Sequence, residues 1–273
     1  MRWAAALLLL WSVSARSQLS VTDDYGNPVR LPAPAGRIVS LAPHLTELLY
    51  AAGAGARLVG AVDYSDFPPP ARELPRVGSD AQISLEAVLA LRPDLVVAWP
   101  NAGTLRTVNR LAELLPTFRS EPRELEDVAT TLERLGVLAG TGREAQDAAR
   151  AFRARKTELE KRYAARARVR VFYQVWERPL LTVNGEHIIS KVIRLCGGEN
   201  VFAAAPLIAP EVDREAVLLA RPEMIVASGG AAVLPNIPFH RVPAELIQRH
   251  TPRLLEGADQ VCRAIEQVRA ARS

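Results

Sequence analysis

Residues 83–99 (ISLEAVLALRPDLVVAW) and residues 212–228 (VDREAVLLARPEMIVAS) are two copies of one pattern. Eight of the seventeen positions are identical, at a constant offset of 129 residues. Each copy opens with a residue suited to cap a helix, Ser84 or Asp213, and continues as a short helical stretch. An Arg-Pro pair then ends the helix, and an apolar strand follows. A helix-turn-strand unit that occurs twice at this distance predicts two related lobes.

Short apolar runs alternate with helical patterns along the rest of the chain. Strands are predicted over residues 37–41, 58–62, 95–99, 169–175 and 224–227. This alternation is typical of βα units with mainly parallel sheets, which places the chain in the α/β class. Residues 46–53 and 190–197 form a second matching pair, each predicted to be a helix capped at its first residue and ended by a glycine.

The segment 143–166 lies between the two sets of strands. It is rich in Ala, Glu, Arg and Lys and contains neither Gly nor Pro, which predicts a long exposed helix of about 36 Å. The expected units are an N-terminal lobe (18–142), this connecting helix (143–166) and a C-terminal lobe (167–273). A rigid strut between lobes predicts little closure on ligand. Because ligands of parallel sheets bind beyond the carboxyl ends of the strands, the site is expected in a cleft between the lobes.

The composition is that of a globular protein, with 49% hydrophobic and 23% charged residues among 273. A formal net charge of +4 without blocks of like charge argues against a nucleic-acid partner. Residues 1–17 combine Arg2, an apolar run and a small-residue ending at Ser17, which is the layout of a secretory signal peptide. We therefore expect cleavage near Ser17 and a periplasmic protein.

Two cysteines, Cys196 and Cys262, are the only ones in the chain. In an exported protein an even count favours a disulfide, which here would close a loop of 66 residues. Two free buried thiols are the alternative. Zinc binding by the pair is disfavoured, because neither cysteine stands in a CxxC motif or beside a histidine.

Three aromatic residues follow predicted strands: Tyr64, Trp99 and Trp176. Rings at the carboxyl ends of strands suit a large, flat, partly apolar ligand, although ordinary packing at the sheet edge is the alternative reading. Glu86 and Glu215 occupy the same place in the two repeats. They either favour the helix dipole or form a symmetric acidic pair that a two-fold partner grips with basic residues.

No sequence motif of an enzyme is found. The four histidines show neither HExxH nor i,i+4 spacing, so no metal site is predicted, and His44 is expected to be solvated or to cap a helix. Nucleotide-binding and nucleophile motifs are missing too, which leaves no catalytic residue to name. An enzyme is nevertheless kept as the alternative functional class: an exported metal-dependent enzyme that uses His44 and Asp66.

Taken together, these features resemble the periplasmic vitamin B12 (cobalamin) binding proteins of ABC importers. This family belongs to the helical-strut, or class III, substrate-binding proteins, which also serve haem and iron siderophores. The resemblance runs from about residue 37 to 268. The resemblance rests on these segments: IVSLAP (38–43) with TEL (46–48), DYSDFP (63–68), the two Glu-containing repeats, CGGENVF (196–202) and TPR (251–253).

The resemblance implies a role for several residues. Tyr64 would contact the corrinoid, and so would the stretch before Thr-Pro-Arg, namely Glu245, Leu246, Ile247, Gln248 and Arg249. Glu86 and Glu215 would dock on arginines of the permease dimer, and Cys196 and Cys262 would form a disulfide. Cobalamin would be a transported ligand and no cofactor is expected. A monomer fits a protein whose two lobes must both face a permease.

This chain also departs from the family pattern. The family commonly carries aromatic rings in the loops before the two repeats and before Thr-Pro-Arg, where this chain has residues 78–80, 206–210 and 246–247 without rings. Trp99 and Trp176 remain. A pocket with fewer rings is compatible with another corrinoid, or with a haem or siderophore as ligand.

Overall fold

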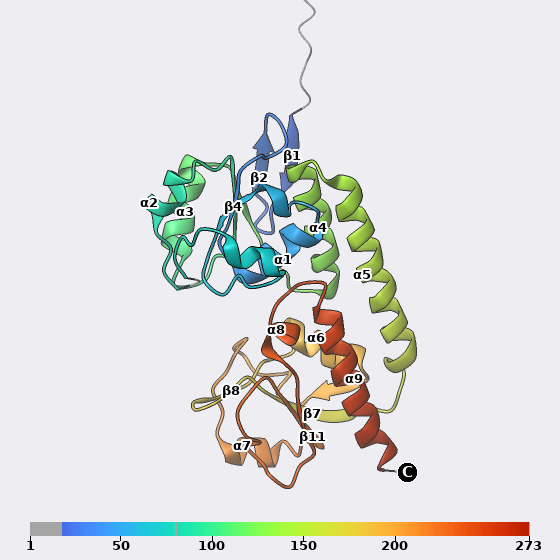
Figure 1. The fold of residues 1–273 in the computed structure, drawn as a ribbon. Coiled ribbons are helices and arrows are strands. Elements are labelled where there is room, and N and C mark those ends of the chain that lie inside the picture. Colours follow the sequence, from blue (N-terminus) through green and yellow to red (C-terminus); the bar gives the residue numbers. More distant parts are fainter. Residues whose placement is uncertain (1–17, 80, 273) are drawn as a thin grey trace, which may run out of the picture.

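The computed structural model describes residues 18–79 and 81–272, and its framework is two four-stranded parallel sheets (Figure 1). The first sheet has the order β4-β3-β5-β6 and the second has the order β10-β7-β11-β12. The strands of the first are β3 (Ile38–Ser40), β4 (Leu58–Ala61), β5 (Leu95–Ala98) and β6 (Thr117–Arg119). Those of the second are β7 (Val169–Gln174), β10 (Gly198–Asn200), β11 (Met224–Ala227) and β12 (Phe239–Arg241). In chain order both sheets read 2-1-3-4, so the lobes share one topology and the predicted fold class is confirmed.

Helices connect and cover these sheets. They are α1 (Pro43–Ala51), α2 (Leu85–Ala90), α3 (Leu105–Leu114), α4 (Leu125–Ala139), α5 (Gly142–Tyr163), α6 (Ile188–Leu195), α7 (Arg214–Leu219), α8 (Ala244–Ile247) and α9 (Leu254–Ala270), with short 3₁₀ turns η1 (Gly55–Arg57) and η2 (Pro69–Glu73). Two small hairpins complete the fold: β1 (Leu19–Thr22) with β2 (Pro28–Leu31), and β8 (Trp176–Glu177) with β9 (Leu180–Leu181). No helix within the described residues is long and apolar enough to cross a membrane.

The sequence repeat corresponds to α2 followed by β5 and to α7 followed by β11. Ser84 Oγ accepts the backbone N–H three residues later at 3.1 Å, and Asp213 Oδ1 does the same at 2.6 Å, so both predicted caps are present. Both helices end before an arginine in the left-handed region, Arg92 at φ 47° and Arg221 at φ 46°. The two copies of the repeat therefore share the same helix cap and the same backbone conformation after the helix, as well as similar sequences.

The starts of α1 and α6 differ from the prediction. Pro43 occupies the first turn of α1, where its missing N–H is no loss, and the His187 imidazole caps α6 by accepting the Ile189 N–H at 3.2 Å. Thr46 and Ser190, predicted as caps, lie inside the helices and are buried. Their hydroxyls are used elsewhere, and Thr46 Oγ1 lies 2.9 Å from Ser40 Oγ. The predicted terminal glycines are correct, with φ near 79° and 73° after α1 and α6.

The connecting helix α5 has 22 residues and is about 33 Å long. Figure 1 shows it running along the side of both lobes, from α4 at one end to the C-terminal lobe at the other. One hydrophobic cluster continues from the first sheet through α1, α4, α5, α6 and α9 to the second sheet. Because the lobes share this core, α5 does not act as a free linker.

A disulfide fastens two helices of the C-terminal lobe. Cys196, which ends α6, is bonded to Cys262 of α9, with a Cα–Cα distance of 4.6 Å. Both residues are fully buried. The reading as two free thiols is therefore wrong.

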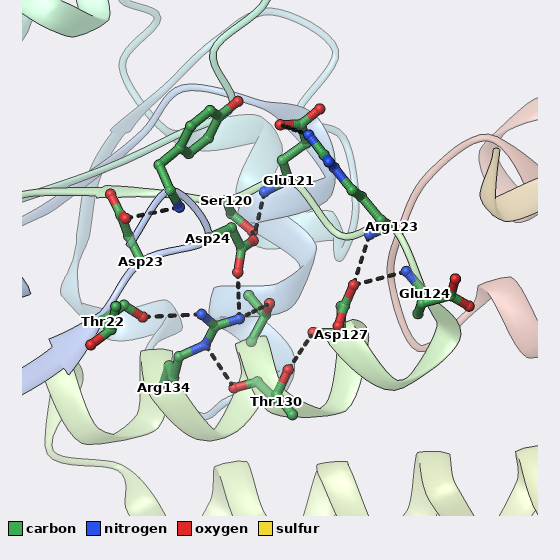
Figure 2. Close-up of polar contacts among 12 residues, drawn as sticks. Thr22, Asp23, Asp24, Ser120, Glu121, Arg123, Glu124, Asp127, Thr130 and Arg134 are labelled. Carbon is green, nitrogen blue, oxygen red and sulfur yellow. Dashed lines mark hydrogen bonds and ion pairs between the residues drawn. The ribbon is translucent and has the colours of Figure 1, made fainter. Parts of the chain in front are cut away.

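The N-terminal hairpin β1–β2 is held on α4 by a polar cluster (Figure 2). Arg134 of α4 pairs with Asp24 Oδ1 at 2.6 Å and donates to the Thr22 carbonyl at 3.0 Å. The other oxygen of Asp24 accepts the Glu121 N–H at 2.6 Å. The segment 1–17, predicted to be a signal peptide, lies outside the described residues.

Candidate functional site

The carboxyl ends of the strands of both sheets lead to a cleft between the lobes. Two neighbouring cavities of about 480 Å³ each lie there and share Ala244 and Gln248 of the α8 region. The first is lined further by residues of the C-terminal lobe, which are Val175, Trp176, Glu177, Arg178, Ser228, Gly229 and Gly230. The second is lined from both lobes, by Asp66, Phe67 and Arg72 on one side and Glu245, Arg249 and Arg253 on the other. Because the cavities share a wall, we treat them as one interlobe cleft.

Two of the three predicted aromatic residues present exposed rings. Tyr64 follows β4 with φ 61° and is 74% exposed, and Trp176 in β8 is 62% exposed. The Trp176 indole N–H donates to the Arg178 carbonyl at 3.0 Å, which fixes the ring at the wall of the first cavity. Trp99 is half-buried, and its ring packs edge-on against His44 with centroids 5.7 Å apart. Trp176 thus lines the first cavity, Tyr64 is exposed on the loop after β4 without lining either cavity, and Trp99 lies deeper.

The stretch 245–249 divides between the cleft and the core. Glu245, Gln248 and Arg249 line the cleft, and Gln248 Nε2 donates to Ser228 Oγ at 3.0 Å. Ile247 is fully buried in the main core, and Leu246 is half-buried against it. These two side chains are thus turned toward the core and line neither cavity, because α8 turns successive side chains to different faces.

Arg249 ties the two lobes together with three contacts. Its Nη1 lies 2.7 Å from Glu47 Oε1 and 2.8 Å from Asp66 Oδ1, and its Nη2 donates to the Tyr64 carbonyl at 3.0 Å. Glu47 is on α1 and only 3% exposed, and it also lies 3.4 Å from Arg253 Nη1. All three acceptors of Arg249 belong to the N-terminal lobe, so its guanidinium joins the C-terminal lobe to the loop that carries Tyr64.

Arg249, Arg253, Glu47 and Asp66 form an interlobe charge cluster, in which groups of opposite charge stabilise each other. Burial disfavours the Asp66 carboxylate, but its hydrogen bond to Arg249 and the guanidinium charge outweigh this and lower its pKa. Burial likewise opposes the Arg249 cation, yet hydrogen bonds to Glu47 and Asp66 raise its pKa. Arg253 adds a stacking contact, with its Cζ 4.0 Å from the Phe67 ring centroid. Asp66 and Arg249 are therefore both charged at neutral pH.

Three histidines from the two lobes meet beside this cluster. The ring centroids of His44 and His250 are 5.7 Å apart, and those of His187 and His250 are 6.4 Å apart. Burial lowers the pKa of His187 to about 4. Burial also lowers the pKa of His250 to about 4, and electrostatic repulsion from the nearby His187 adds to this effect. Burial also lowers the pKa of His44, helped by His250 and Arg249. These imidazoles are neutral at pH 7.

His44 does not match its expected role. It is 8% exposed, lies in the first turn of α1, and its Nε2 has no hydrogen-bond partner among the described residues. The prediction of a solvated or capping side chain was wrong because the lobes pack around it, and the capping histidine is His187 instead. Within the described ranges, no group of three or more His, Cys, Asp or Glu side chains is arranged to hold a metal ion.

Glu86 and Glu215 line neither of the two cavities. Both are exposed, in the first turns of α2 and α7. Figure 1 shows α2 and α7 on the same side of the molecule, opposite α5, one on each lobe. The two glutamates are therefore equivalent groups at two separate points of one face.

The chain is similar to known proteins in sequence and structure. Residues 38–251 match the family model described as periplasmic binding protein. The vitamin B12-binding protein of Vibrio cholerae serotype O1 is 37% identical over 246 residues, which is 85% of this chain and 89% of that protein. The vitamin B12-binding protein of Yersinia pestis is 37% identical over 250 residues, 87% of this chain and 89% of that protein.

Solved structures extend the likeness to the fold. The periplasmic vitamin B12 binding protein BtuF of Vibrio cholerae superimposes with a TM-score of 0.80 at 36% identity, covering 86% of this chain and 98% of that one. The periplasmic heme-binding protein RhuT of Roseiflexus sp. RS-1 gives 0.74 at 20% identity, covering 86% and 99%, which is a likeness of fold alone. On these matches and on its two-lobed architecture, the chain belongs to the periplasmic binding protein family.

Proposed function

We propose that this chain binds cobalamin, or a closely related corrinoid, in the interlobe cleft and delivers it to the permease of an ABC importer. The observation that carries the proposal is an interlobe cleft with the exposed Trp176 ring on its wall and the exposed Tyr64 ring on a loop that Arg249 joins to it, in a chain 37% identical to vitamin B12-binding proteins over 85% of its length. It acts as a monomeric binding protein in the periplasm after removal of residues 1–17, without catalysis and without a cofactor of its own.

The proposed contacts divide by chemistry. Tyr64 and Trp176 offer ring faces to the flat macrocycle, and each aromatic side chain buries about 150–250 Å² in such a contact. Glu245, Gln248 and Arg249 offer polar groups that suit the amide side chains around a corrinoid. Trp99, half-buried and in edge-on contact with His44, is proposed as a third, deeper ring contact. Ile247 is buried in the core and Leu246 packs against it, so both are left out of the proposed contact set.

The residues for delivery lie apart from the cleft. Glu86 and Glu215 are proposed as docking points for basic groups of a two-fold symmetric permease. Because both carboxylates are exposed and line neither cavity, their replacement is expected to leave ligand affinity unchanged while it abolishes stimulation of the transporter.

Calorimetry on the chain from Gln18 tests the ligand. Cyanocobalamin and haemin are titrated separately, with absorbance of the complex checked after gel filtration. We expect one-to-one binding of cyanocobalamin, weakened about tenfold by Tyr64→Ala and by Trp176→Ala because each loses a stacking surface. Tyr25→Ala is the matched control, since Tyr25 is 44% exposed on the N-terminal hairpin and remote from the cleft.

Two results would contradict the proposal. Binding of haemin without cyanocobalamin would move the ligand to the haem branch of this fold. Binding of neither molecule would remove the proposed transport role altogether.

A further inference from the structure

The two repeats expose leucines at equivalent positions. Leu89 of α2 is 37% exposed, and its counterpart Leu218 of α7 is 54% exposed. Each follows its glutamate by three residues, so carboxylate and isobutyl group share one face of the short helix. In the second copy Leu219 adds a side chain that is 82% exposed. A single exposed leucine needs no explanation, but the same Glu-Leu pair on both lobes does.

These leucines are not required for packing of the lobes. The inward face of each helix is formed by another residue, Val88 in α2 and Val217 in α7, and both valines are fully buried. Leu89 and Leu218 point away from that side. The side chains of Leu89 and Leu218 therefore lie outside the core, at equivalent positions on the surface of the two lobes.

Each helix is fixed to its sheet by the same arginine contact. Arg37, beside β3, donates through Nη2 to the Leu91 carbonyl at 2.7 Å. Arg170, in the equivalent strand β7, donates through Nη2 to the Ala220 carbonyl at 2.6 Å and through Nε to the Arg221 carbonyl at 3.2 Å. Both contacts hold the carboxyl ends of α2 and α7. The exposed Glu-Leu pairs are thus presented on rigid supports at a set separation.

The carboxylates beside the leucines have no basic partner in the part of the chain that is described. Glu86 Oε2 accepts only the Ser84 hydroxyl, at 3.3 Å, and Glu215 forms no ion pair with a described Lys or Arg. A partner that supplies a cation next to an apolar recess would complement both groups of each pair.

We propose that Leu89, Leu218 and Leu219 form the apolar centre of two docking patches whose charged rim is Glu86 and Glu215, and that their occupant is the homodimeric permease. The inference rests on the proposed function and extends its docking points from two charges to two mixed surfaces. Two equivalent patches on one rigid face require two equivalent recesses, which a two-fold dimer provides. Apolar anchors at the centre carry most of the affinity of such contacts, and rim charges mainly set rate and register.

Binding of the ligand-loaded protein to its own importer, reconstituted in nanodiscs, tests this inference. The double variant Leu89→Ser, Leu218→Ser is expected to weaken the complex about tenfold or more and to lose most of the ATPase stimulation. Val137→Ser is the matched control, because Val137 is a 41% exposed apolar residue on α4, and it should behave as the parent. Cyanocobalamin affinity, measured on the same samples, should stay unchanged in all variants.

The outcomes separate this inference from the proposed function. Normal binding by the leucine variant beside loss in Glu86→Ala, Glu215→Ala would overturn the role of the leucines and leave the glutamate docking intact. Self-association of the parent through these leucines, seen by light scattering and removed in the leucine variant, would assign the patches to a second copy and refute the permease. Failure of the parent to bind cyanocobalamin would instead remove the proposed function.

Discussion

Removal of the Arg249 side-chain charge is expected to destabilise the protein strongly. Arg249→Met keeps most of the aliphatic stem but deletes the donors to Glu47, Asp66 and the Tyr64 carbonyl. Glu47, only 3% exposed, would keep only the 3.4 Å contact to Arg253, whereas Asp66, with a side chain 53% exposed, would return to water. The free-energy change is therefore dominated by the carboxylate of Glu47.

Breaking one side of a buried ion pair costs about 3–5 kcal/mol when the remaining charge has no partner. Because Arg253 stays near Glu47, we expect a smaller loss than this range, about 2–3 kcal/mol of unfolding free energy at pH 7. For a chain of this size that corresponds to a fall in Tm of roughly 4–12 °C. Urea unfolding and differential scanning fluorimetry measure both quantities.

Two variants control this experiment. Arg249→Met combined with Glu47→Leu removes the orphaned charge and should recover most of the lost stability. Arg110→Met breaks an ion pair with Glu113 in which both side chains are about 60% exposed, and it should change stability by less than about 1 kcal/mol. The reasoning is refuted if Arg249→Met is as stable as Arg110→Met, or if Glu47→Leu adds further destabilisation.

Three further predictions concern the disulfide, pH and lobe closure. Replacing Cys196 and Cys262 by alanine opens a 66-residue loop and should lower the unfolding free energy by about 4 kcal/mol in urea titrations, whereas an unchanged midpoint would contradict this. The pKa values of His187 and His250 are about 4 when folded and about 6.5 when unfolded, so the unfolded state binds more protons between these values and stability must fall as pH drops from 6.5 to 4. The slope should exceed about 1.4 kcal/mol per pH unit and flatten in His187→Asn, His250→Asn; equal slopes would exclude these residues as the cause. Small-angle scattering with and without cyanocobalamin should show a radius of gyration unchanged within about 1 Å, since the lobes share a core, and a larger contraction would contradict that rigidity.

Local features of the fold could be predicted from the sequence. The repeats, the caps Ser84 and Asp213 and the terminal glycines of α1 and α6 all act within a few residues, and the structure confirms them. The starts of α1 and α6 could not be predicted, because Thr46 and Ser190 are good capping residues whose hydroxyls are used by buried tertiary contacts.

The centre of the site was beyond sequence reasoning for a related cause. Arg249 and Glu47 are 202 residues apart, and His44 meets His250 only because the lobes pack against each other. No periodicity or spacing encodes such a meeting. The exposed rings of Tyr64 and Trp176 were identifiable because a strand end is a local property, whereas the burial of Ile247 depends on how α8 is seated on the core.

The core that crosses from one sheet to the other also sets the order in which the chain can complete its structure. The apolar side of α5 is covered in part by α9 (Leu254–Ala270), which follows the whole first lobe in the chain and is therefore synthesised after it. The first lobe therefore cannot finish alone while the rest is being made, unlike a protein whose domains fold one after another. Loss of α9 would expose the seam between the halves and leave Cys196 without its partner, so the integrity of both lobes depends on this one helix.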